Sequence, residues 1–223
     1  MNNSYCCAIC CQIAGQRDGD LLAELIGSEK RYVRRVILEN EHFVVFPSVG
    51  PLKVGHVILC PKYHYPSFAC LPSRLEDEYQ GIRTQLSKLL EATFGEKVHI
   101  FEHGTDAQFS RIPCSVEHAH QHFLPTNAEV WDALHSDIEW QSVSLNVPSL
   151  ERVAKGREYL LYHSPEDSTH MAAAPKNGFE SQYIRRIFAN ALGKSNQWNW
   201  RVHPRPLDVE ETFMTLTQAS LVA

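Results

Sequence analysis

Three histidines at alternating positions, His118, His120 and His122, constrain this chain more than any other feature of its sequence. In an extended strand, residues i, i+2 and i+4 project from one face, about 7 Å apart along the chain. A strand at this point would therefore present a row of three imidazoles. Because imidazole titrates near neutral pH, and Thr, Lys or Glu would serve a solvent-facing strand without titrating there, we interpret the row as a functional face.

Length and composition set the class of protein. A chain of 223 residues with 43% hydrophobic and 21% charged residues predicts one globular core, or one domain with an elaboration. No apolar run is long enough to cross a membrane, and the first thirty residues lack the pattern of a secretory signal, so we expect a cytoplasmic protein. The net charge of −5 argues against nucleic acid as the partner.

Four of the seven cysteines crowd together near the start of the chain, at Cys6, Cys7, Cys10 and Cys11. Close neighbours cannot easily pair with one another, so the group indicates a metal site or free thiols rather than a disulfide framework. Cys7 and Cys10 have the spacing that lets two thiolates bind one tetrahedral zinc. Such a site needs two further ligands.

The first half of the chain alternates strand and turn signals. Residues 32–38, 42–46 and 55–60 predict an antiparallel meander of three strands. Apolar residues at helical spacing then predict a long helix from position 75 to 94, ended by Gly95, with Ser73 and Glu76 as its capping box. A strand over 97–103 is expected to pair with the histidine strand as a hairpin with a long loop.

The second half carries weaker signals. Strands are predicted over 140–147 and 158–163, and an amphipathic helix over 181–192; a further short helix is expected near the N-terminus, over 20–26. We therefore divide the chain into residues 1–126, an α+β unit, and residues 127–223, an α+β elaboration packed on it rather than an independent domain.

Three motifs occur together in one order: Cys7-x-x-Cys10, then Gly55-His56 followed by Pro61-Lys62-x-His64, then Ser115-Val116-x-His118-x-His120-x-His122. In combination they resemble the histidine triad (HIT) family of nucleotide hydrolases and transferases, over roughly residues 5–126. The resemblance implies an α+β fold in which a long helix packs on an antiparallel meander sheet, often in a two-fold homodimer. Residues 1–126 would then form the nucleotide-binding catalytic domain, and the role of residues 127–223 stays open.

The resemblance also implies roles for the triad. A nucleoside phosphate would bind with its α-phosphorus against the three histidines, and His120 would attack it. A neutral imidazole can make that attack, giving a nucleotidyl-histidine that water hydrolyses. His122 and Ser115 would stabilise charge on the phosphate oxygens. Ser115 lies an odd number of residues from each histidine, so in a strand it would project from the opposite face. We therefore expect it in the loop before the strand.

Zinc-bearing members of the family use two cysteines, a histidine after the Pro-Lys segment and the first histidine of the triad. By resemblance these are Cys7, Cys10, His64 and His118, a set suited to a closed structural zinc site. Cys6 and Cys11 could compete for the thiolate positions. Free thiols beside a surface His64 are the alternative.

Three further residues fall where the family binds the nucleoside. Phe46 and Ser48 match its base and ribose pocket, but the ribose position commonly holds a carboxylate, so Ser48 would bind more weakly and the nucleoside is left open. For Phe46, the alternative is packing in the core. For His56, which is expected close to the active face, the alternative is a core histidine whose hydrogen bonds are satisfied. Gln121 replaces a usually apolar residue, which predicts a wetter reverse face or one covered by the C-terminal part.

His122 stands where the transferase branch of the family has Gln, which favours hydrolysis over transfer. We therefore expect a hydrolase that cleaves a nucleoside 5′-phosphate bond, in a phosphoramidate or a dinucleoside polyphosphate, through a covalent intermediate on His120. One alternative is nucleotidyl transfer or phosphorolysis, with an acceptor site built by the C-terminal part. The other is a non-catalytic nucleotide-binding protein, which Ser48 and Gln121 motivate.

Overall fold

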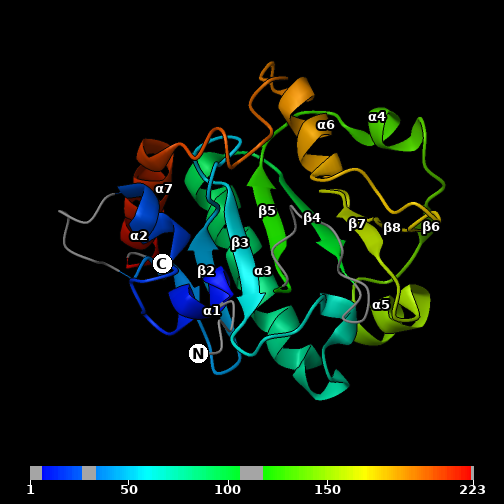
Figure 1. Cartoon of the computed structure of the whole chain (residues 1–223), viewed down its shortest axis with the longest axis horizontal. Helices are drawn as coiled ribbons and strands as arrows, with labels where there is room; N and C mark the ends of the chain where they lie inside the picture. The colour runs from blue at the N-terminus through cyan, green and yellow to red at the C-terminus, as the bar shows by residue number, and fades with distance from the viewer. Residues whose placement is uncertain (1–6, 27–33, 106–117, 222–223) are drawn as a thin grey trace, which may run out of the picture.

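The computed structural model describes residues 7–26, 34–105 and 118–221. Within them, one antiparallel sheet of eight strands runs through the molecule in the order β1-β2-β3-β5-β4-β7-β8-β6 (Figure 1). Its strands are β1 (Leu38–Glu39), β2 (Phe43–Pro47), β3 (Val57–Pro61), β4 (Val98–Gly104), β5 (Gln121–Pro125), β6 (Gln141–Ser142), β7 (Tyr159–His163) and β8 (Thr169–Ala173).

The predicted hairpin and the order of the meander are confirmed, but the first strand, predicted over 32–38, is reduced to β1: residues 34–37 lie outside any strand, and 32–33 lie outside the described residues. Strands β1, β2 and β3 pair antiparallel in sequence order, and β4 pairs with β5 so that Phe101 lies opposite His122. Strand β5 starts only at Gln121, so His118 and His120 precede it instead of lying within it. The strand predicted over 140–147 is reduced to β6, because Asn146 caps a helix there by accepting a hydrogen bond from the backbone N–H of Ser149.

The helices are α1 (Ala8–Ile13), α2 (Leu21–Ile26), α3 (Glu76–Phe94), α4 (Trp131–His135), α5 (Val147–Ala154), α6 (Tyr183–Ala191) and α7 (Pro206–Ser220), with short 3-10 turns η1 (Phe68–Cys70) and η2 (Ser73–Leu75). The long helix α3 ends at Gly95, whose φ of 65° suits glycine, as predicted. The capping box is wrong. Ser73 lies in η2, and the Glu76 carboxylate instead accepts a hydrogen bond from the backbone N–H of Val147, so it joins α3 to α5.

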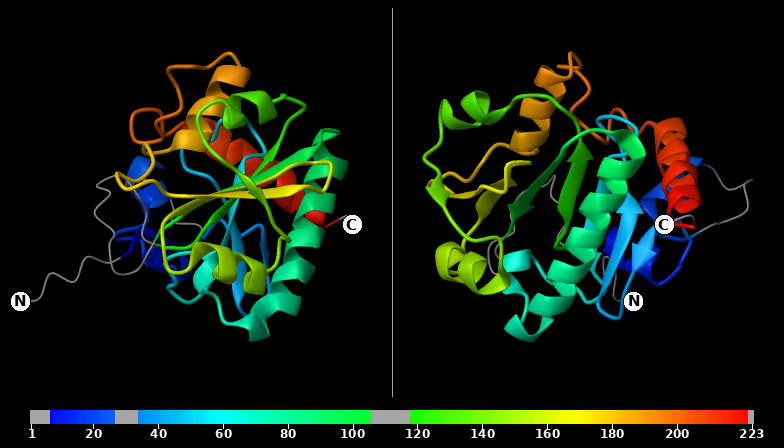
Figure 2. Two further views of the ribbon diagram at one scale, coloured as in Figure 1. Left: turned by 90° about the vertical axis from the view of Figure 1, so that its right-hand side faces the viewer. Right: turned by 180° about the vertical axis from the view of Figure 1, so that it is seen from behind.

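The two faces of the sheet carry different helices. Alternate strand residues such as Phe43, Val45 and Phe123 pack into one core with α3, α5 and α7, and α3 crosses the near side of the sheet in the right-hand view of Figure 2. Residues of opposite parity face the other way: Phe46 packs with α1, and Phe101 packs with α6. The predicted α+β fold, a long helix on an antiparallel sheet, is confirmed.

The reverse face of the histidine strand is buried, so of the two expectations drawn from Gln121 the wetter face is wrong. The Tyr79 hydroxyl donates to Gln121 Oε1 at 2.8 Å, and Gln121 Nε2 donates to the Glu102 carboxylate at 3.3 Å. All three side chains are buried, and burial raises the pKa of Glu102 to about 7. Helix α3, which carries Tyr79, covers this face together with α5 and α7, so the C-terminal part also contributes to the cover.

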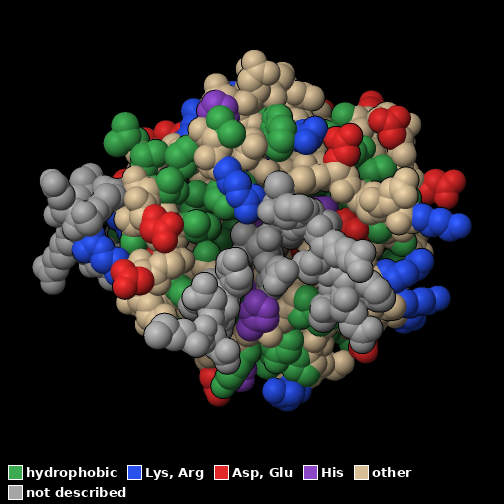
Figure 3. All heavy atoms as spheres, viewed as in Figure 1, with side chains coloured by type: hydrophobic (Ala, Val, Ile, Leu, Met, Phe, Trp, Pro, Cys, Tyr) green, Lys and Arg blue, Asp and Glu red, His purple; other side chains and the backbone are tan. Residues whose placement is uncertain are grey.

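Residues 127–223 contribute to the same sheet as the first half. Strand β7 pairs with β4 over five residue pairs, and β8 and β6 continue the sheet beyond it. The division at residue 126 stays a prediction. None of the described helices is long and apolar enough to span a bilayer. Acidic and basic side chains occur on the same face of the molecule (Figure 3).

Candidate functional site

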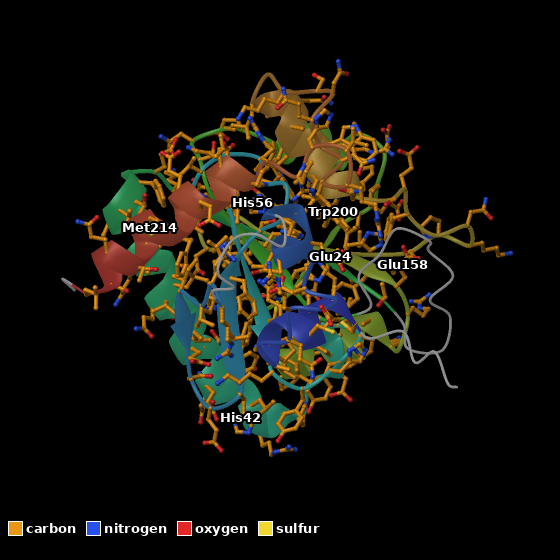
Figure 4. The ribbon with its side chains drawn as sticks, turned by 60° about the vertical axis from the view of Figure 1, so that its left-hand side comes forward. Glu24, His42, His56, Glu158, Trp200 and Met214 are labelled. Atoms are coloured by element: carbon orange, nitrogen blue, oxygen red, sulfur yellow. The ribbon has the colours of Figure 1, made fainter. Side chains whose placement is uncertain are left out.

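A pocket of about 110 Å³ opens on the sheet face that carries α1 and α6. Both halves of the chain build it: α1 and the end of β2 form one wall, β3, β4 and β5 form the floor, and the start of α6 forms the other wall. Trp200, labelled in Figure 4, closes it from the segment between α6 and α7. The polar side chains at its lining that matter below are Gln12, Ser48, His120, His122 and Arg185.

His120 presents an unprotonated nitrogen to this pocket. Its Nδ1 lies 2.7 Å from the backbone carbonyl oxygen of His118. A carbonyl can only accept, so Nδ1 carries the proton, and in a neutral imidazole Nε2 then carries the lone pair. Burial lowers the pKa of His120 and so favours the neutral ring. The geometry therefore orients Nε2 as a nucleophile or a base.

His122 has the opposite tautomer, set by a chain of hydrogen bonds. The backbone N–H of Leu52 donates to His56 Nδ1 at 3.1 Å, so His56 must carry its proton on Nε2. That Nε2–H donates to His122 Nδ1 at 3.0 Å, which leaves the proton of His122 on Nε2. Burial holds the pKa of both rings well below the usual range, so both are neutral. His122 therefore acts as a hydrogen-bond donor, its ring 5.0 Å from that of His120.

The first histidine of the triad faces a different group of residues. His118 Nδ1 lies 3.3 Å from Cys10 Sγ and 3.7 Å from Cys7 Sγ, and His64 Nδ1 lies 3.4 Å from Cys10 Sγ. Ligands of one tetrahedral zinc have S···N separations of about 3.6 Å, given Zn–S near 2.3 Å and Zn–N near 2.05 Å. The Nε2–H of His118 donates to the carbonyl of Pro61 at 2.8 Å, which turns the lone pair of Nδ1 toward the thiols.

These four residues can hold a metal ion. Their ligand atoms all lie within 4.8 Å of one another. Cys11, which could have competed as a ligand, is disulfide-bonded, and its Sγ lies beside Gly19. Cys6 lies outside the described residues. The four side chains that the resemblance implied as ligands therefore lie together in one cluster that could hold a metal ion, and the assignment of a metal stays a prediction.

The three residues predicted to bind the nucleoside do not all line the pocket in the structure. Ser48 lines the pocket. Phe46 is fully buried in the apolar cluster under α1 and is not part of the pocket lining, as its core-packing alternative expects. His56 lies behind His122 and acts on the pocket through it. Ser115 lies outside the described residues.

Several pocket residues were not singled out by the sequence analysis. Gln12 lies on α1, Tyr183 and Arg185 start α6, and Trp200 follows α6. An arginine beside Ile184, on the apolar face of the helix predicted over 181–192, was the available signal for Arg185, but nothing local indicates that α6 packs opposite the histidine strand. These residues can be recognised as pocket residues only in the folded structure, where both halves of the chain line the same pocket.

Comparisons with known proteins bear on the fold. No protein-family model matches the chain, and no curated protein matches it. Solved structures do match: a hypothetical histidine triad nucleotide-binding protein from Sulfolobus tokodaii has 17% identity and a TM-score of 0.35, over 41% of this chain and 60% of that one. A HIT-family protein from Bacillus subtilis has 18% identity and a TM-score of 0.39, over 54% and 72%.

A Hit-like protein involved in cell-cycle regulation from Bartonella henselae has 19% identity and a TM-score of 0.35, over 48% of this chain and 78% of that one. Over about half its length, the chain is similar in structure to HIT-family proteins. With identities and scores this low, the similarity carries no argument about the site. The case for function rests on the residues of the pocket.

Proposed function

We propose that this protein hydrolyses a nucleoside 5′-phosphate bond, with His120 as the nucleophile. The observation that carries the proposal is the pair of opposite tautomers in one pocket: a bare Nε2 on His120 beside an Nε2–H on His122. A nucleophile next to a fixed donor suits attack at phosphorus, where negative charge builds on the non-bridging oxygens.

The reaction would proceed in two displacements. His120 Nε2 bonds to the α-phosphorus, and the bond to the leaving group breaks with its electron pair going to the leaving atom. His122 donates to a non-bridging oxygen as charge grows there. Water then attacks the same phosphorus and releases a proton to solvent, the P–N bond breaks, and the nucleoside monophosphate leaves while Nε2 regains its lone pair. Having His122 rather than Gln at this position supports water as the acceptor.

The pocket walls suit a nucleoside. Ile9, Ile58 and Trp200 give apolar surface for a base, while Ser48 gives a hydroxyl for the ribose. Without a carboxylate among the described lining residues, the ribose would be held only weakly. We therefore expect modest discrimination between nucleosides and do not assign one.

Zinc is the metal we propose for Cys7, Cys10, His64 and His118. Burial, followed by the neighbouring Cys7, raises the pKa of Cys10 to about 11, and a cation bound at this thiol would offset the shift by favouring the thiolate. All four positions are taken by protein ligands, which is the pattern of a structural site. The ion would tie α1 to the segment that precedes β5 and so fix the backbone that carries His120.

The test is the His120→Ala variant, with His170→Ala as its control. His170 is half-buried like His120 but lies outside the pocket. Hydrolysis of adenosine and guanosine phosphoramidates and dinucleoside polyphosphates should fall by roughly 10³-fold or more in His120→Ala and stay unchanged in His170→Ala. Activity within tenfold of wild type in a folded His120→Ala protein contradicts the proposal. If the wild-type protein binds these nucleotides tightly but hydrolyses none of them, the non-catalytic alternative is favoured.

A further inference from the structure

Arg185 places a buried positive charge at the pocket. It is 4% exposed, in the first turn of α6, and it is the one Lys or Arg among the described lining residues, which include no Asp or Glu. Its Nε donates to the carbonyl of Trp198 at 3.1 Å and its Nη2 to the carbonyl of Gly50 at 2.6 Å. Both acceptors are neutral, and no carboxylate in the described parts of the chain forms an ion pair with the guanidinium.

Burial lowers the pKa of Arg185 only to about 10, so the side chain stays charged at neutral pH. A buried charge without a partner is costly, because its lost hydration is not replaced. This charge lies near enough to His120 and His122 to lower their pKa further, after the larger effect of burial. An anion bound at the end of the pocket where α6 begins would balance this charge.

Two further groups of donors belong to residues that line the same pocket. The backbone N–H groups of Ile184 and Arg185 find no acceptor within the described residues, as is usual in the first turn of a helix, and no side chain caps α6. From the opposite wall, Gln12 lines the pocket with a side chain that is 6% exposed, and its Nε2 has no hydrogen-bond partner in the described structure.

These donors exceed what a single phosphoryl group requires. The α-phosphate attacked by His120 has two non-bridging oxygens, and His122 already donates to that group. Resting on the proposed function, we propose that Arg185 and the first turn of α6 bind the phosphate next to the α-phosphate. The substrate is then a nucleoside polyphosphate whose leaving group is itself a phosphate, rather than a phosphoramidate.

The chemistry makes the two substrate classes separable. With a polyphosphate, the bond between the α-phosphorus and the bridging oxygen breaks, and that oxygen keeps the electron pair and becomes a terminal oxygen of the leaving phosphate. The guanidinium stabilises this added negative charge, and no proton has to move. With a phosphoramidate, the leaving nitrogen must take a proton and departs as an amine. A cation beside it gives no such stabilisation.

The experiment compares Arg185→Met with Arg186→Met. Arg186 is the next residue of α6, stacks on Trp198 at 3.9 Å and pairs with Glu180 at 3.0 Å, and it is not part of the pocket lining, so its replacement removes the same charge from the same helix. The substrates are a dinucleoside polyphosphate and a nucleoside phosphoramidate with an uncharged amine. For each, kcat/KM is measured.

In Arg185→Met, kcat/KM should fall by about 100-fold or more for the polyphosphate and stay within about fivefold for the phosphoramidate. Arg186→Met should leave both unchanged. Arg185→Lys, which keeps the charge, should recover part of the lost rate with the polyphosphate alone. Equal losses on both substrates would overturn the proposal, because Arg185 would then support the fold or the α-phosphate.

A binding measurement tests the subsite without turnover. Inorganic pyrophosphate is titrated calorimetrically into the wild type and the variants. The wild type, Arg186→Met and His120→Ala should bind it, and Arg185→Met should not. If the wild type hydrolyses neither substrate but binds pyrophosphate through Arg185, the proposed hydrolysis fails and the anion subsite stands. If the wild type fails to bind pyrophosphate, the subsite is refuted, whatever the activity.

Discussion

Replacing His56 by Leu tests the hydrogen-bond chain that fixes the tautomer of His122. His56 is fully buried, accepts from the backbone N–H of Leu52 and donates to His122 Nδ1. It is not part of the pocket lining, so the substitution leaves the pocket wall in place and removes only the groups behind it. Leucine fills a similar volume and forms neither bond.

The substitution has two effects of different size. It leaves a buried N–H and a buried ring nitrogen unpaired, which should lower the free energy of unfolding by about 2–4 kcal/mol. It also releases the His122 ring, whose orientation was held by a hydrogen bond worth about 1–1.5 kcal/mol, so kcat/KM should fall by about tenfold. The stability loss alone would not change the rate of the folded fraction.

His99→Leu is the matched control for this experiment. His99 is also buried and forms two hydrogen bonds, to Tyr162 Oη at 2.9 Å and to the carbonyl of Thr126 at 3.1 Å. It lies outside the lining of the catalytic pocket, so we expect a comparable loss of stability and a kcat/KM within about twofold of wild type.

The assay is steady-state hydrolysis at a temperature where circular dichroism shows all three proteins to be folded. Nitrogen NMR of the histidine rings supplies a second readout, because His122 should be protonated on Nε2 alone in the wild type and should populate both tautomers in His56→Leu. Equal activity in His56→Leu and His99→Leu, with an unchanged His122 tautomer, would refute the reasoning.

Three more predictions follow from the structure. Chelation of the metal or Cys10→Ser should lower both the zinc content by mass spectrometry and the melting temperature, whereas Cys70→Ser, which replaces an exposed free thiol, should change neither. Gly104→Ala should lower the free energy of unfolding in urea by about 1–3 kcal/mol, because the new Cβ would lie 2.2 Å from the buried ring of Tyr159; an unchanged value would contradict the packing. Burial lowers the pKa of His163 to about 4, below its unfolded value near 6.5, so its stabilisation is complete above pH 6.5 and is lost as the pH falls toward 4. Buried histidines such as His99 lose stability over the same range, so the His163 share is read as a difference: between pH 7 and pH 5 the free energy of urea unfolding should fall by about 2 kcal/mol more in the wild type than in His163→Gln.

The sequence predicted the elements with strong periodicity and missed those that depend on tertiary contacts. The meander, α3 and the hairpin of β4 with β5 follow from local alternation and helical spacing. The capping box failed because Glu76 has a better partner in the backbone of α5, a contact between residues far apart in the chain. Helix α7 was missed although Pro206 stands at its first turn, where proline commonly starts helices.

The candidate site divides in the same way. The triad and the Cys7–Cys10 pair belong to compact motifs that spacing alone can pick out, and the family resemblance added His64 and His118 to the cluster that the structure brings together. Arg185, Gln12 and Trp200 lie in different segments, and only packing brings them to one pocket. Phe46 shows the converse, since an apolar residue on a strand looks the same in sequence whether it faces a pocket or a core.

The central claim is that His120 forms a bond to phosphorus during turnover. The most direct test mixes enzyme with a substrate nucleotide, quenches within one turnover in base, because a phosphorus–imidazole bond is labile in acid, and maps the adduct by mass spectrometry. We predict one nucleotidyl group on His120 that forms and decays as fast as product appears, and none in His120→Ala. Turnover without an adduct, retained in His120→Ala, would contradict the account.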